Sequence, residues 1–209
     1  MSSPDTPHPL EARRFSIKFF VSQPFEAGLR AVVPVFHGWI QRRALDEDLL
    51  IDVADYAHVH RGPGILLIGH EAQYSFDEVG GRLGLRYSRR RRGEGSVTAR
   101  LSTAFSAALR ACRLLQDEPA LAGKLRFRFD EIELQILDRL VSPTSPEAFQ
   151  VVQEEMQRFL SGLYAVAAGI EIRPIGGAKD PLALHIQISP ASAVPAVDTL
   201  LSRLESLVA

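Results

Sequence analysis

The sequence predicts an α+β protein made of two tandem ferredoxin-like (split βαβ) units, each with a mostly antiparallel sheet and helices on one face. Segments with the two-residue apolar period of strands alternate with segments that have the three- and four-residue spacing of amphipathic helices. Residues 131–209 also repeat the order strand, helix, strand, strand, helix that begins in residues 13–130. A single larger α+β domain is the alternative, and the two sheets could also merge.

The first unit begins after a polar, proline-containing segment, residues 1–12, which we expect to form a flexible tail. FSIKFFV at 15–21 predicts the first strand. Apolar residues at helical spacing then continue to about Arg43 and predict an amphipathic helix. Pro34 lies inside that pattern and should kink or split the helix, because proline removes a backbone donor.

The next two strands, predicted at 49–56 and 65–69, are joined by HVHRGPG, whose glycines and proline are typical of a turn. The uninterrupted ILLI run lacks polar alternation, which indicates an interior strand covered on both faces. Alternation at 82–88 predicts a strand with one solvated face, near a sheet edge. A long amphipathic helix is predicted at 96–116.

The boundary between the units is predicted at Asp130–Glu131. Apolar residues occupy odd positions from 125 to 129 and even positions from 132 to 136, which requires a bulge or a break because strand side chains alternate. The second unit then contains, in order, a strand to 137, a helix carrying Phe149 to Leu163, strands at 170–175 and 182–189, and a last helix carrying Val197 to Leu207.

Composition indicates an ordinary globular protein of 209 residues, with 46% hydrophobic residues and a formal net charge of −1. That charge disfavours a protein devoted to nucleic acid. The single cysteine, Cys112, falls in a helical apolar pattern, so we expect a core residue rather than a disulfide or thiolate cage. Neither a secretory signal nor a membrane-spanning run is evident, so we expect a cytoplasmic protein without membrane contact.

Titratable residues are densest between Leu49 and Glu71, and they suggest a metal site. Imidazole and carboxylate groups are good ligands for zinc or non-haem iron, and two histidines two residues apart on a strand point the same way. The candidate ligands of a divalent metal are His58, His60, His70 and Glu71, with His37 as a further candidate. The alternative is that these polar groups only make hydrogen bonds in loops and at strand ends.

The same region offers general acid–base chemistry as a second hypothesis. Asp52 lies in an otherwise apolar strand, where a carboxylate must be paired, hydrogen-bonded or shifted in pKa. Asp52, His70 and Glu71 are therefore the candidate catalytic residues, although a structural role for Asp52 is the commoner outcome. The candidate ligand-binding residues are His37, Trp39, Asp55 and Tyr56.

A basic run follows the 82–88 strand and forms a third candidate site. It could hold phosphates of RNA or a nucleotide, or an acidic protein partner. Tyr87 is the one aromatic residue within it, whereas RNA surfaces use several aromatic residues for stacking. A solvated loop is the simplest interpretation, and nucleic acid is not the expected partner. The run consists of Arg86, Arg89, Arg90, Arg91 and Arg92.

The segments VFHGWIQ, LLIDVADY, GPGILLIGHE and GRLGLRYSRR resemble those of an uncharacterised family of bacterial proteins, over residues 15–140. This resemblance implies no activity, cofactor or catalytic residue.

No motif of an established enzyme class is present, so we expect a non-catalytic binding or assembly module. It would recognise a small ligand or a protein partner and form a homo-oligomer such as a homodimer. A metal-dependent enzyme built on residues 52–71 is the alternative, and RNA binding through residues 86–92 is the second alternative.

Overall fold

The computed structural model describes residues 11–12, 14–22, 24–45, 48–138, 145–166, 169–177, 180–190 and 194–208. The predicted tail, residues 1–12, lies almost wholly outside this part of the chain. The described strands are β1 (Phe15–Val21), β2 (Leu50–Tyr56), β3 (Gly64–Gly69), β4 (Ala72–Asp77), β5 (Gly84–Arg89), β6 (Phe127–Ile136), β7 (Ile170–Ile175) and β8 (Ala183–Ile188). The helices are η2 (Leu29–Val32), α1 (Val33–Arg42), η3 (Val79–Gly81), α2 (Val97–Asp117), α3 (Pro146–Tyr164) and α4 (Val197–Val208).

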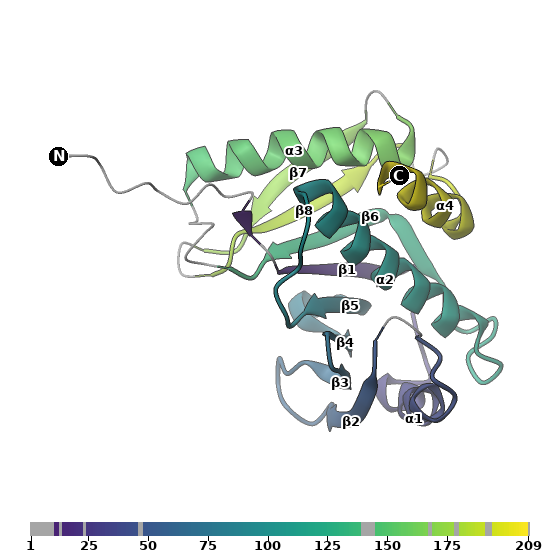
Figure 1. The fold of residues 1–209 in the computed structure, drawn as a ribbon. Coiled ribbons are helices and arrows are strands. Elements are labelled where there is room, and N and C mark those ends of the chain that lie inside the picture. The colour runs from purple at the N-terminus through teal and green to yellow at the C-terminus, as the bar shows by residue number, and fades with distance from the viewer. Residues whose placement is uncertain are drawn as a thin grey trace.

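The described strands form one eight-stranded sheet in the order β2-β3-β4-β5-β1-β6-β8-β7. Every pairing is antiparallel. Strands β1 and β6 lie side by side inside the sheet and join the two halves of the chain (Figure 1). The predicted α+β class is confirmed, whereas the finer division into two tandem ferredoxin-like units is not confirmed.

The predicted irregularity near residue 130 is a β-bulge within β6. Phe19 of β1 pairs with Ile132, but the next residue, Phe20, pairs with Arg128. The extra residues of β6 restore the inward position of apolar side chains on both sides of the bulge. The predicted boundary at Asp130–Glu131 therefore falls inside a continuous strand.

Two strand predictions are corrected. The strand predicted at 82–88 near a sheet edge is β5, which lies in the interior of the sheet between β4 and β1. Its alternation arises because one sheet face carries polar groups, and an interior strand can show that pattern as well as an edge strand. Sequence analysis also missed β4, whose AQYSFD sequence contains few of the aliphatic residues that mark strands.

Local sequence signals fix where the helices begin. Pro34 occupies the first turn of α1, directly after η2, so the predicted split of the helical pattern is confirmed. The Ser96 side chain accepts a hydrogen bond from Ala99 N at 3.1 Å and caps α2. Ser145 caps α3 in the same way through Ala148 N.

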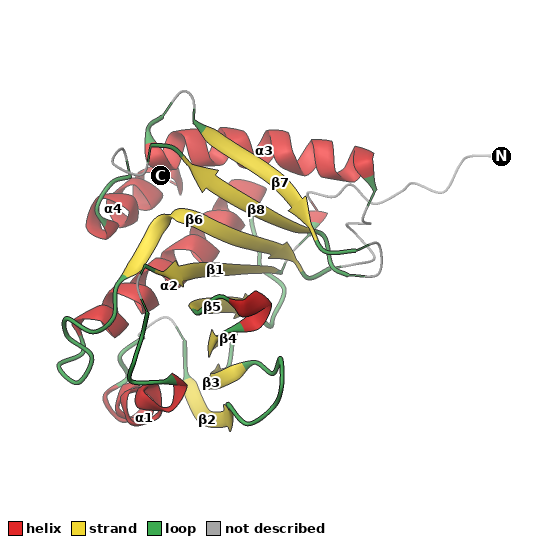
Figure 2. Ribbon diagram, turned by 180° about the vertical axis from the view of Figure 1, so that it is seen from behind, coloured by secondary structure: helices red, strands yellow, loops and turns green. Residues whose placement is uncertain are grey.

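The helices cover one face of the sheet, as the sequence predicted. Figure 1 shows α2 crossing in front of β1, and Figure 2 shows the strands in front when the molecule is seen from behind. Helix α2 contacts β1 and β5, whereas α4 packs on α2 and α3 instead of on the sheet. The large core residues between these layers include Ile17, Phe19, Leu85, Phe105 and Ile132, all at or near complete burial.

The opposite face of the sheet contains a buried ion pair between Lys18 of β1 and Asp77 of β4. Lys18 Nζ lies 2.7 Å from Asp77 Oδ1 and also donates to the carbonyl oxygens of Val79 and Arg82. Burial lowers the pKa of Lys18, although Asp77 opposes that shift. A Cβ atom on Gly84 would lie 2.7 Å from Lys18 Cε, so glycine is needed beside this pair. The pair fastens the β4–β5 connection to β1.

We predict that Lys18→Met destabilises the protein by about 3–5 kcal/mol, because the buried Asp77 carboxylate loses its partner at 2.7 Å and keeps only the more distant Arg86 Nε, at 3.8 Å. The double variant Lys18→Met/Asp77→Leu should recover most of that loss, since no uncompensated charge remains. Urea unfolding of the two single variants and the double variant gives the coupling energy. Additive single effects would show that the pair does not act as a unit.

Candidate functional site

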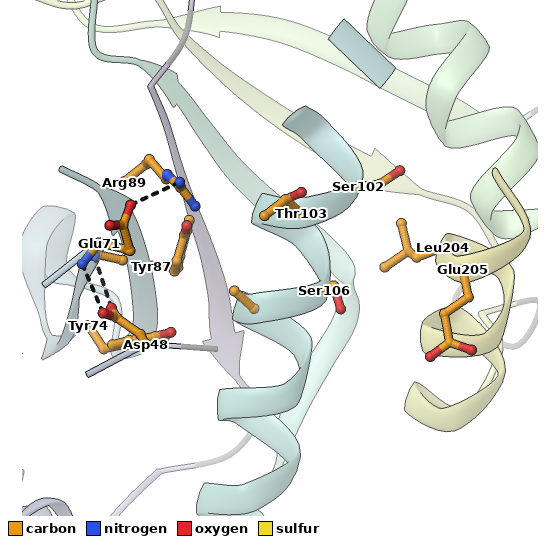
Figure 3. A pocket seen from close by; sticks show the side chains of 12 residues that line it. Asp48, Glu71, Tyr74, Tyr87, Arg89, Ser102, Thr103, Ser106, Leu204 and Glu205 are labelled. Carbon is orange, nitrogen blue, oxygen red and sulfur yellow. Dashed lines mark hydrogen bonds and ion pairs between the residues drawn. The ribbon is translucent and has the colours of Figure 1, made fainter. Parts of the chain in front are cut away.

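A cavity of about 300 Å³ lies beside α2, and we call it the α2 cavity. Its wall on the sheet side comes from β4 and β5, and its other walls come from α2 and α4 (Figure 3). This volume is at the lower end of the range for small-ligand pockets. The residues that define its shape and chemistry are Tyr74, Tyr87, Arg89, Ser102, Ser106 and Leu204.

Two buried tyrosines form the middle of the cavity wall on the sheet side. Tyr74 of β4 and Tyr87 of β5 are cross-strand partners, and their rings meet edge to face with centroids 5.5 Å apart. Such an arrangement holds aromatic rings more firmly than aliphatic packing does. Their position gives the α2 cavity a rigid aromatic side.

A polar corner, formed by Asp48 and Glu71, borders the aromatic side. Both carboxylate oxygens of Asp48 accept backbone hydrogen bonds, from Glu71 N at 2.8 Å and from Ala72 N at 2.9 Å. Glu71 in turn accepts a hydrogen bond from Arg89 Nη2 at 3.1 Å. A Cβ atom on Gly69 would lie 2.2 Å from Asp48 Oδ2, so this turn requires glycine. The corner is therefore fixed before any ligand binds.

The α2 side of the cavity carries hydroxyl groups. Ser102, Thr103 and Ser106 follow one another along the helix, and Figure 3 shows Ser102 and Ser106 extending toward the α4 side. Ser102 is buried, and its Oγ has no hydrogen-bond partner within the described part of the chain. A buried hydroxyl without a partner costs roughly 1–3 kcal/mol. Such unpaired buried hydroxyls are rare in well-packed proteins, and this one distinguishes the α2 side of the cavity.

A second cavity of about 430 Å³ adjoins the first along α2. Tyr74, Ala107 and Glu205 line both cavities. Ion pairs from α2 to α4, Arg110 with Glu205 at 3.7 Å and Arg113 with Asp198, border the second cavity. The two cavities together follow α2 from Ser102 to Leu114.

The predicted metal ligands are not brought together. His58 and His60 are exposed in the β2–β3 connection, whereas His70 and Glu71 form the β3–β4 turn at the opposite ends of these strands. His70 Nδ1 lies 3.1 Å from Glu71 Oε1, and this is the one contact within the set. No group of three or more metal-ligating side chains occurs in the residues that the structure describes. His37 lies on the exposed side of α1.

Asp52 is exposed on β2, and its Oδ1 accepts a hydrogen bond from Val53 N at 2.8 Å. The sequence predicted that this carboxylate would be paired, hydrogen-bonded or shifted in pKa, and the structure places it, hydrogen-bonded, on the exposed edge strand. Asp55 pairs with Arg30 at 2.7 Å and also accepts from Ala57 N. The hydrogen bond from Ala57 N, followed by that from Arg30, lowers the pKa of Asp55. Asp52 and Asp55 therefore make local hydrogen bonds in and beside the edge strand β2.

The other two predicted ligand-binding residues have different surroundings. Trp39 is fully buried, and its Nε1 donates to Glu118 at 2.6 Å, which ties α1 to the end of α2. Tyr56 is exposed and lines an open groove of about 770 Å³ at the β2–β3 connection. Of the predicted residues, Glu71 and Arg89 line the α2 cavity.

The predicted basic run does not form one surface. Arg86 is buried and pairs with Glu133 at 2.7 Å. Arg89 pairs with Glu71, and Arg90 donates to the carbonyl of Gly69 at 2.8 Å. Arg91 lies 3.8 Å from Glu71, and Arg92 is exposed. Most of the run thus fastens β5 to the β3–β4 turn.

A charged network that the sequence did not reveal lies on the sheet face opposite the α-helices. Glu131 of β6 is buried and lies between Arg82, whose Nη2 donates at 2.7 Å, and His185 of β8, whose Nε2 lies 2.6 Å away. Arg128 Nη1 lies 3.2 Å from Glu131 as well. The hydrogen bond from Arg82 is the main reason that the pKa of Glu131 falls to about 2. The alternation of polar and apolar residues in β6 and β8 is the sequence feature that could have predicted this network.

Comparison with known proteins adds no family assignment: no family model matches the sequence, and no curated protein is significantly similar to it. Within the described residues, none of the helices is long and apolar enough to cross a membrane.

We predict that Glu131→Gln reduces the loss of stability in acid. The pKa of this carboxyl falls from an ordinary 4.5 to about 2 in the folded protein. Its ionised form therefore stabilises the fold above about pH 4.5, and that contribution is lost as the pH falls toward 2. The effect is on the order of 2 kcal/mol, since Arg82 is partly exposed to solvent.

Urea unfolding at a series of pH values between 7 and 2 measures this effect. Glu171→Gln, which changes an exposed carboxylate on β7, is the matched control and should keep the wild-type profile. Parallel profiles for the wild type and Glu131→Gln would contradict the role of Glu131.

Proposed function

We propose that this chain is a non-catalytic binding module that takes a small ligand in the α2 cavity. The observation that carries the proposal is a cavity of about 300 Å³ with Ser102 in its lining, whose covered hydroxyl has no hydrogen-bond partner among the residues that the structure describes. A ligand with a hydrogen-bonding group can satisfy such a hydroxyl after a small side-chain adjustment. The protein core gains nothing from leaving it unpaired.

The lining indicates the class of ligand. Tyr74 and Tyr87 provide an aromatic wall, while Thr103, Ser106 and the Glu71–Arg89 pair provide hydrogen-bonding groups. A small molecule with a flat apolar body and hydroxyl, amide or amino substituents fits that combination. The fixed Asp48 corner means that little side-chain ordering is needed on binding, which favours affinity.

Binding rather than catalysis is proposed because the carboxylates of the polar corner, Asp48 and Glu71, already accept hydrogen bonds from neighbouring groups. Both oxygens of Asp48 accept backbone amides, and Glu71 pairs with Arg89 and His70. A general base needs a carboxylate or imidazole within reach of a substrate proton. In this corner, the same atoms hold the β3–β4 turn.

We also propose that the two halves are variants of one topology merged through β1 and β6. In the second half, α3 connects β6 to β7 with β8 between them, as in a split βαβ unit. In the first half, α1 connects β1 to β2 with β3, β4 and β5 between them. Successive antiparallel pairings make both connected strand pairs parallel. The first half would then be the second with two additional strands.

The ligand proposal is tested by a fragment screen observed through backbone amide NMR shifts. Bound fragments should shift the amides of residues 102–107 on α2 and of Leu204 on α4. Ser106→Phe should fill the cavity and weaken binding by at least about tenfold, a loss of about 1.4 kcal/mol. Ser106 is only half-buried, so the larger side chain can be placed without disrupting the core.

The matched control is Ala122→Phe, which places the same side chain on the exposed connection between α2 and β6. It should leave fragment affinity unchanged. The proposal would be contradicted by fragments that bind Ser106→Phe as well as they bind the wild type. Fragments that shift the amides of the 57–62 connection instead would contradict it too.

A further inference from the structure

Exposed apolar side chains gather along one edge of the sheet. Six large hydrophobic residues are exposed within the described part of the chain, and five of them lie on β2 or beside it. Leu49 is 65% exposed and Ile51 is 54% exposed, at the beginning of the edge strand β2. The other three, Tyr56, Val59 and Val79, line the open groove at the end of β2. An exposed apolar edge strand is a site for pairing with another strand.

The opposite edge is protected against such pairing. Strand β7 contains Pro174, which lacks the backbone donor that a new strand would need. Glu171 and Arg173 are both exposed on it and pair with each other at 2.7 Å. Charged residues and proline are the usual protection of an edge strand. Strand β2 has no proline, and its one register shift, between Leu50 and Asp52, leaves residues 52–56 in regular register and able to pair.

We propose that two copies of this chain form a dimer in which the β2 strands pair antiparallel about a two-fold axis at Ala54. Only one edge of each sheet is able to pair, so the assembly closes at two copies instead of growing into a filament. The two sheets then become one continuous sheet of sixteen strands, twice the eight in each copy.

The pattern of β2 is self-complementary about Ala54. Antiparallel pairing places the apolar Leu49–Ile51 end of one copy against the Tyr56–Val59 end of the other, so the exposed apolar residues cover each other. It also places Asp52 of each copy opposite Tyr56 of the other and diagonal to His58. Within residues 52–56 this register places no acidic side chain directly opposite another acidic side chain.

The centre of the strand is free of strong like-charge repulsion. Asp55 is paired with Arg30 at 2.7 Å, so two copies do not bring bare carboxylates together there. Val53 N donates to the Asp52 side chain through an exposed bond, which shows that this amide points away from β3. Once Val53 N gives up its bond to Asp52 Oδ1, Val53 and Asp55 can exchange backbone hydrogen bonds with Asp55 and Val53 of the second copy.

The test is the concentration dependence of the molar mass, measured by analytical ultracentrifugation on the full chain. We expect a single species of twice the chain mass at about 100 µM, with dissociation on dilution. Ile51→Lys should raise the dimer dissociation constant by at least about tenfold, because it places charge in the apolar contact. Val53→Pro should do the same by removing an outward donor.

Leu207→Lys is the matched control, since Leu207 is exposed on α4, away from the β2 edge. It should leave the dissociation constant unchanged, and circular dichroism should show wild-type folding for all three variants. A wild-type chain that stays monomeric at about 100 µM would overturn the proposal. A dimer that Leu207→Lys weakens while Ile51→Lys does not would overturn it too.

Discussion

The fold depends on the central pairing of β1 with β6 and on the way β1 holds both faces of the sheet. Its odd residues, such as Phe19, pack under α2, while Lys18 on the other face is buried against Asp77. A lysine without solvent requires a carboxylate and further acceptors, and the β4–β5 connection supplies them. Strand β1 thus joins the two halves, packs against α2 and holds the β4–β5 connection on the face opposite the α-helices.

This arrangement explains where the cavity lies. Because α4 packs on α2 and α3 rather than on the sheet, α2 contacts α4 as well as β1 and β5. The small residues Ser102, Ser106 and Ala107 leave space where these layers meet. The sheet wall is fixed by the Asp48 corner, and the helical side is formed where α4 packs on α2. The cavity is therefore a consequence of layer packing and not of a mobile loop.

The sequence predicted the elements better than their partners. Periodicity located β1 and β7 at their observed bounds, and the parity change near residue 130 predicted the bulge in β6. Strand order is set by contacts between distant segments, which no local pattern records, so β5 was placed at an edge. The histidines looked clustered because they are close in sequence, but the two ends of a strand separate them. Ser102 could not be distinguished from any other small helical residue.

Hydrogen exchange followed residue by residue tests most directly whether β1 and β6 make the two halves one folding unit. The structure predicts that amides of β1, β5, β6 and β8 exchange slowest and share one free energy of opening, because these interior strands contribute to one buried core on both sides of the β1–β6 pairing. If the amides of β6 and β8 remained protected under conditions in which those of β1 and β5 had fully exchanged, the halves would unfold separately. That result would contradict a single folding unit held together by the β1–β6 pairing.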